Sequence, residues 1–120
     1  MKTSENKYVN SWSGRFRAPL IEFIILYEGA YSPSEAYPYS IAKKCELEWG
    51  VDSVPLTTIY SAIKRLENEN LIRIDGEIVS GRVQKQISTM PDGFIVLKEL
   101  QESIKNQCNW FNEFQLDKVI

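Results

Sequence analysis

The residue types that usually carry enzyme chemistry are scarce in this sequence. It contains no histidine, and its two cysteines, Cys45 and Cys108, lie far apart and match no metal-ligand spacing. A general base would have to be a carboxylate or a lysine held in a pocket, and no spacing of these residues suggests one. The glycines form no phosphate-binding loop. We therefore predict that the protein is not an enzyme and has no metal ion or cofactor. The cysteines could form a disulfide, but reduced thiols are the interpretation that we favour.

The sequence does offer a candidate for the recognition of DNA, a helix at residues 56–70, although for this helix taken alone an ordinary solvated polar face is the interpretation that we favour. Ile59, Ile63 and Leu66 recur at helical spacing and would form its buried stripe. The opposite face is polar and hydrogen-bonding near its start and becomes basic midway along. A helix that enters the major groove needs such a face, because its first residues must approach the base edges. The predicted groove contacts are Thr57, Thr58, Ser61 and Lys64, and the predicted phosphate contacts are Tyr60 and Arg65.

A β-hairpin is predicted to follow this helix. Between residues 71 and 90, isoleucines first alternate with charged residues, and the later part continues as a β-like run. The turn is expected at residues 80–82, although Asp75 and Gly76 form a rival turn that would shift the register. Arg82 and Lys85 would then lie on a wing, residues 78–88, that contacts the DNA backbone or the minor groove.

Two further helices are predicted before residue 56. Residues 18–28 are apolar almost all round, so this helix must be buried on more than one face, and Gly29 suits its end. After a single capped turn at residues 32–35, Pro38 fits the start of a second helix at residues 39–49 that Gly50 ends. Asp52 and Ser53 are candidate caps for the helix at residues 56–70.

The N-terminal residues 1–17 are expected to form a flexible arm. Arg15 and Arg17 could reach DNA from this arm, but an ordinary flexible tail is the interpretation that we favour.

The last predicted helix has the pattern of a subunit interface. Residues 89–92 have the layout of a capping box, and Leu97, Ile104 and Phe111 follow at intervals of seven residues. Together with the apolar first helix, this stripe predicts a homodimer. The aromatic residues near the C-terminus could line a ligand cavity, although plain dimer packing is favoured. The predicted interface residues are Leu20, Phe23, Ile24, Leu97, Leu100, Ile104, Phe111 and Phe114.

These elements define the expected fold class. It is mainly α with a small β-hairpin: a winged helix-turn-helix at residues 18–90, preceded by the arm at 1–17 and followed by a C-terminal dimerisation helix at 91–120.

Three segments resemble the PadR family of winged helix-turn-helix transcriptional regulators. Residues 58–67 resemble the family's recognition-helix string T-[IV]-Y-x-x-L-x-x-L-E. Residues 81–85, with Gly93 beyond them, resemble the wing string G-R-x-R-K and its following glycine, and residues 39–41 resemble G-Y-x-I. The resemblance implies a homodimer that dimerises through its first and last helices, binds double-stranded operator DNA and represses transcription. In some members, small molecules bind at or near the dimer interface, so the resemblance also raises the prospect of an effector there.

Several positions depart from the family's pattern. Pro38 and Asn70 replace glycines, Gln86 and Ile87 stand where paired tyrosines are usual, and Met90 replaces a threonine. The chain therefore resembles a divergent member, and neither operator nor effector can be carried over to it.

The overall charge gives DNA binding little support. The net charge is −2 and the pI is about 5.2. Positive charge gathers at residues 1–18, with four basic residues and one acidic (net +3), and at residues 56–90, with five basic and four acidic (net +1). The acidic balance keeps open an alternative, a winged-helix protein-interaction module without DNA binding. No apolar run is long enough to cross a bilayer and the N-terminus has no signal-peptide pattern, so we expect a cytoplasmic protein.

Overall fold

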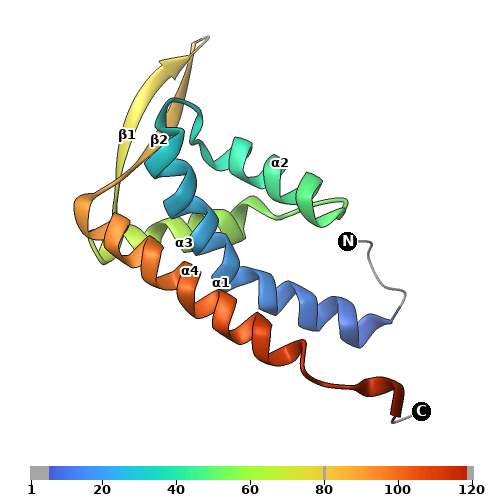
Figure 1. Ribbon diagram of the computed structural model, residues 1–120. Coiled ribbons are helices and arrows are strands. Elements are labelled where there is room, and N and C mark those ends of the chain that lie inside the picture. The colour runs from blue at the N-terminus through green and yellow to red at the C-terminus, as the bar shows by residue number, and fades with distance from the viewer. Residues whose placement is uncertain (1–5, 80, 119–120) are drawn as a thin grey trace.

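The computed structural model describes residues 6–79 and 81–118 and has the predicted fold class, mainly helical with one antiparallel hairpin (Figure 1). The hairpin projects from one end of the helical body, and the first and last helices run alongside each other (Figure 1). The elements in chain order are α1 (Lys7–Tyr31), a 3₁₀ turn (Pro33–Glu35), α2 (Pro38–Trp49), α3 (Leu56–Asn68), β1 (Ile72–Val79), β2 (Arg82–Thr89), α4 (Pro91–Phe111) and a 3₁₀ turn (Leu116–Lys118).

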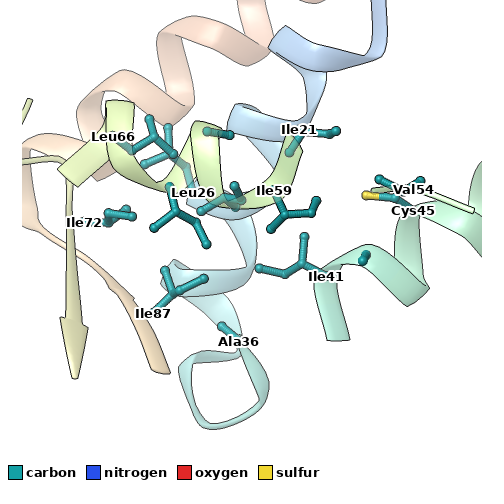
Figure 2. Packing of buried hydrophobic residues seen from close by; sticks show 14 of the residues in the cluster. Ile21, Leu26, Ala36, Ile41, Cys45, Val54, Ile59, Leu66, Ile72 and Ile87 are labelled. Atoms are coloured by element: carbon teal, nitrogen blue, oxygen red, sulfur yellow. The ribbon is translucent and has the colours of Figure 1, made fainter. Parts of the chain in front are cut away.

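One hydrophobic core joins the helices to the base of the hairpin (Figure 2). Ile21 and Leu26 of α1, Ile41 of α2, Ile59 of α3 and Ile87 of β2 are each at most 1% exposed. Burial of an aliphatic side chain of this size contributes about 1.5–3 kcal/mol. The stripe predicted for the inner face of α3 therefore fixes the orientation of that helix, and its polar face is turned outward.

The first helix begins earlier than the sequence predicted. It starts at Lys7 rather than at Ala18, so the expectation of a flexible arm is wrong for residues 7–17. The side chain of Asn6 caps this helix by accepting hydrogen bonds from the backbone N–H groups of Tyr8 (2.9 Å) and Val9 (3.1 Å). Pro19 lies inside α1 and does not end the helix.

Gly29 does not end α1 but allows the hairpin to approach it. The helix continues to Tyr31, and a Cβ atom on Gly29 would lie 2.6 Å from Oγ1 of Thr89. That hydroxyl donates a hydrogen bond to the carbonyl oxygen of Leu26 (2.8 Å). Thr89 therefore holds β2 against α1, and the predicted capping box is wrong because Met90 is the N-cap of α4 and makes no side-chain cap.

The ends of the other helices confirm most of the predicted pattern. Pro38 opens α2, and Gly50 ends it with φ of 63°. The N-cap of α3 is Pro55, so the predicted caps at residues 52 and 53 are not used. Asn70, which replaces a family glycine, adopts φ of 58°, a conformation that asparagine tolerates better than most residues. The last helix ends at Phe111, well short of the predicted residue 120.

The register of the hairpin confirms the predicted turn. Val79 pairs with Arg82, so the turn consists of residues 80–81, of which Gly81 has φ of 78° and residue 80 lies outside the described part. The rival turn is excluded because Asp75 and Gly76 lie within β1 and pair with β2.

Candidate nucleic-acid interface

The outer face of α3 is a polar strip that is open to solvent. Thr57, Ser61 and Lys64 are exposed along it, and Thr58 is half-buried at its edge. These side chains lie opposite the buried stripe, as expected from about 100° of rotation per residue. The strip therefore presents hydroxyl groups in its first turns and a lysine ammonium group one turn later.

One edge of this strip faces the wing. The ammonium group of Lys85 lies 5.7 Å from the centre of the Tyr60 ring, a cation–π contact that joins β2 to α3. A hollow of about 530 Å³ lies between these elements and the start of α2. Its lining includes three tyrosines, Tyr37, Tyr39 and Tyr60, together with Lys85. Tyrosine hydroxyls and a lysine in one open hollow can donate hydrogen bonds to phosphate oxygens.

The base of the wing is held by the segment between α1 and α2. The side-chain amide of Gln86 donates a hydrogen bond to the carbonyl oxygen of Pro33 (2.6 Å), and the N–H of Ile87 donates to that of Ala36 (2.8 Å). At the two positions where the PadR sequence pattern has paired tyrosines, this chain thus has one anchoring residue, Gln86, and one core residue, Ile87. The predicted contact Arg82 begins β2, but its side chain lies outside the described part of the chain.

The other edge of the strip faces α1. Arg65 forms an ion pair with Glu22, with 3.2 Å between Nη2 and Oε2. The predicted phosphate contact at Arg65 therefore already has a carboxylate partner. Thr58 lines a second hollow, of about 410 Å³, that extends from the start of α3 to the N-terminal half of α1.

The turn between α2 and α3 is fixed by a carboxylate. Glu46 accepts a hydrogen bond from the N–H of Val54 (2.8 Å), and this bond lowers the pKa of Glu46. The buried Glu28 of α1 is hydrogen-bonded and ion-paired to Lys44 of α2. These contacts join α2 to the turn that precedes α3 and to α1.

The predicted interface residues divide into two groups. Five of the eight line one apolar hollow of about 270 Å³ between α1 and α4: Leu20, Phe23, Leu100, Ile104 and Phe111. The others do not line it, because Leu97 is buried in the core, Ile24 packs against the core, and Phe114 lies beyond α4 with its ring 5.0 Å from that of Trp110. Phe16 and Pro19 line the same hollow from α1 and were not predicted from the sequence. Their spacing from Leu20 and Phe23 is helical and would have indicated them had the helix been extended to Lys7.

The two cysteines lie outside the polar strip of α3, and Cys108 lines the apolar hollow between α1 and α4. Cys45 is buried and Cys108 exposed, both as free thiols, and burial raises the pKa of Cys45 to about 11. Among residues 6–79 and 81–118, no group of three or more histidine, cysteine, aspartate or glutamate residues is placed to hold a metal ion. None of the helices in the described part is both long enough and apolar enough to cross a membrane.

The chain is similar to known proteins in structure rather than in overall sequence. No protein-family model matches the sequence, and no curated protein matches it. Solved structures do match. A PadR family transcriptional regulator from Eggerthella lenta aligns with a TM-score of 0.71 and 21% identity over 88% of this chain and 90% of its own.

Two further solved structures are similar to this chain over most of their length. A PadR-like transcription factor from Bacteroides fragilis aligns with a TM-score of 0.65 and 24% identity over 85% of this chain and 96% of its own. A PadR-like transcriptional regulator from Bacillus cereus aligns with a TM-score of 0.66 and 22% identity over 84% of this chain and 99% of its own. The chain has a PadR-like fold. The PadR-like fold spans the winged helix and continues into α4, since the alignments cover most of both chains.

Proposed function

We propose that the chain is a sequence-specific DNA-binding transcriptional regulator that acts as a homodimeric repressor. In this proposal α3 enters the major groove and the wing, residues 78–88, contacts the backbone or the minor groove. The observation that carries the proposal is the exposed polar strip of α3, bordered by the cationic edge of the wing at Lys85. The PadR-like fold supports it, because the matching structures are described as transcription factors or transcriptional regulators.

The strip has the chemistry that base reading requires. The hydroxyls of Thr57 and Ser61 can donate and accept hydrogen bonds at base edges, and Lys64 can donate to guanine acceptors in the major groove. On the wing side, Tyr60 and Lys85 are suited to the phosphates that border the groove. Arg65 would contact a phosphate only if its ion pair with Glu22 opened or the phosphate were shared with it.

The apolar hollow between α1 and α4 is the basis for the proposed homodimer. Half-buried Leu20, Phe23, Leu100 and Ile104 border it, and Phe111 is 59% exposed at its end. A second copy packed on this face would remove that apolar surface from water, at about 25 cal/mol per Å². A symmetric pair would present two α3 helices to half-sites about 34 Å apart. The same hollow is our candidate site for a small-molecule effector.

DNA binding can be tested by fluorescence anisotropy with the promoter region of the protein's own gene and a scrambled duplex, each at two salt concentrations. We expect tighter binding to the promoter, and weaker binding by Lys64→Ala than by Lys98→Ala, which removes an exposed charge from α4. Equal, weak binding to both duplexes would refute sequence specificity. Absence of binding to either duplex at low salt, with a stable protein partner in a pull-down, would favour the protein-interaction module instead.

The homodimer and the action as a repressor need separate experiments. Light scattering should give twice the monomer mass for the wild type and for Lys98→Glu, and the monomer mass for Ile104→Glu, which puts a charge into the apolar hollow. Unchanged mass for Ile104→Glu would exclude this face as the interface. A reporter fused to the promoter should rise in activity when the regulator is deleted, and a fall would indicate an activator.

A further inference from the structure

The N-terminal half of α1 lies beside the start of α3. Glu22 of α1 contacts Arg65 of α3, and Arg15, seven residues earlier, lines a hollow together with Thr58, seven residues before Arg65. The two helices therefore pack against each other along this edge of the strip, and α1 crosses α3 in Figure 1. Residues 7–14 precede this contact and extend α1 beyond it.

This part of α1 carries positive charge that is not neutralised within it. Residues 6–21 contain three basic residues, Lys7, Arg15 and Arg17, and no acidic residue. Arg15 is exposed, and its guanidinium group donates a hydrogen bond to the neutral hydroxyl of Ser11 (2.8 Å). In the described part of the chain, the carboxylates that pair with arginines are Glu22, with Arg65, and Asp75, with Arg73. The charge of Arg15 is thus available to an external anion.

Arg17 has a different role although it is only two residues away. Its guanidinium carbon lies 5.7 Å from the centre of the Trp49 ring, so it packs against the end of α2. Its Nε atom is buried and has no hydrogen-bond partner among the described residues. Arg17 therefore anchors this half of α1 to α2, while Arg15, about 200° further round the helix, remains open to solvent.

The dimensions of the major groove indicate what Arg15 could contact if α3 entered the groove. The groove is about 12 Å wide and an α-helix with its side chains is about 10–12 Å across, so a helix in the groove has one phosphate backbone on each side. On α3, Tyr60 and Lys85 occupy the wing side of the polar strip. Arg15, Ser11 and Thr58 occupy the opposite side, where the second backbone would pass.

We propose that residues 7–17 of α1 form a third DNA-contacting element, in which Arg15, supported by Ser11, binds phosphate groups of the backbone strand on the α1 side of α3. The inference rests on the proposed function, because it requires α3 to enter the major groove. An arginine suits this role, since its planar guanidinium group can donate two parallel hydrogen bonds to one phosphate. The contact carries no sequence information and would add affinity for any duplex.

The test compares Arg15→Gln with Lys98→Gln, which removes one exposed charge from α4. The probe is a mixed-sequence duplex of about 30 bp, long enough for two half-sites one helical turn apart. Anisotropy titrations over a range of salt concentrations give the slope of log K against log salt. For Arg15→Gln we expect this slope to fall by about 0.9 for each phosphate that the variant no longer neutralises, and hence by about 1.8 for a dimer. Lys98→Gln should keep the wild-type slope.

Two outcomes would overturn the inference in distinguishable ways, and a third calls for a second experiment. If Arg15→Gln keeps the wild-type affinity and slope while Lys64→Ala weakens binding, α3 binds DNA without α1 and only the inference fails. If the wild type binds no duplex at low salt, the proposed function fails with it. If Arg15→Gln shows a lower melting temperature and a changed circular dichroism spectrum at the same time as weaker binding, the comparison is decided by the cleavage experiment that follows.

A tethered cleavage reagent locates α1 on the DNA without removing Arg15. An iron chelate is attached to Ser11→Cys in a Cys108→Ser background, where the remaining Cys45 is buried. The matched attachment site is Gly14→Cys, which is exposed, has no neighbour within 4 Å of its Cβ position and leaves the bond between Arg15 and Ser11 intact. We expect strand scission of the bound duplex from residues 11 and 14 and none from the same chelate attached to Lys98→Cys. Equal or absent scission from all three positions would refute contact between α1 and the backbone.

Discussion

Substituting Gly29 with alanine tests the contact between α1 and the wing. Within a helix, alanine is favoured over glycine by about 0.8–1.0 kcal/mol, so the helix alone would gain stability. Against this, the new Cβ atom would lie 2.6 Å from Oγ1 of Thr89 and 3.1 Å from Cγ2 of Ile87. Overpacking of this kind costs about 1–3 kcal/mol, and removal of the hydrogen bond from Thr89 to Leu26 costs about 0.5–1.5 kcal/mol. We therefore expect a net destabilisation of about 1–3 kcal/mol.

The same helix offers a matched control at Gly14. A Cβ atom there would have no neighbour within 4 Å, so Gly14→Ala should gain up to about 1 kcal/mol in stability. Urea denaturation of both variants at one protein concentration measures the two changes, whose signs should be opposite. A Gly29→Ala variant as stable as the wild type would refute the close approach of β2. A destabilised Gly14→Ala would instead show that α1 is not helical before Ala18.

Three further outcomes are expected from the contacts around α2. Lys44→Met leaves the buried carboxylate of Glu28 without its partner and should lower the free energy of unfolding by about 1 kcal/mol. This value is near the lower end of the usual cost of an unpaired buried polar group, because the Lys44 side chain is 53% exposed. An unchanged urea denaturation curve would contradict this expectation. The pKa of Glu46 is lowered in the folded protein, so its stabilising effect is complete above about pH 4.3 and is lost as the pH falls through the lowered value. The difference in melting temperature between the wild type and Glu46→Gln should therefore be constant down to that pH and shrink below it; a constant difference at all pH values would refute the assignment. In a Cys108→Ser variant, the remaining Cys45 is buried with a pKa of about 11, and it should react with a thiol reagent only as the protein unfolds, whereas fast reaction of the native protein would show that its burial is wrong.

The parts of the fold that the sequence predicted correctly depend on local patterns. The start and end of α2 followed from Pro38 and Gly50, whose conformational limits act within one or two residues. The inner and outer faces of α3 followed from helical periodicity, and the hairpin turn followed from strand alternation with Gly81 between the strands. The fold class could therefore be predicted without knowing any contact between residues that are distant in the sequence.

The errors concern residues whose role is decided by a distant partner. Gly29 resembles a helix end, but its lack of a side chain is required because β2 packs closely against it. The contacting residue, Thr89, lies 60 residues further along the chain. Thr89 resembles a helix cap but bonds to α1, and Arg65 resembles a free phosphate ligand but pairs with Glu22. Leu97 has the same spacing as the other predicted interface residues of α4, yet it is buried in the core of the single chain. Periodicity gives the face of a helix but not what covers that face.

Because α1 is a single uninterrupted helix, it connects three surfaces that would otherwise be independent. Phe23 borders the apolar hollow, Glu22 contacts α3, and the turn at Leu26 and Gly29 bears against the wing. A rotation of α1 about its own axis would therefore move both edges of the polar strip at once. Under the proposed function, a molecule that binds between α1 and α4 would change the affinity for DNA through a difference in its own affinity for two orientations of α1. The chain would then regulate its DNA affinity by repositioning one rigid rod rather than by folding or unfolding a segment.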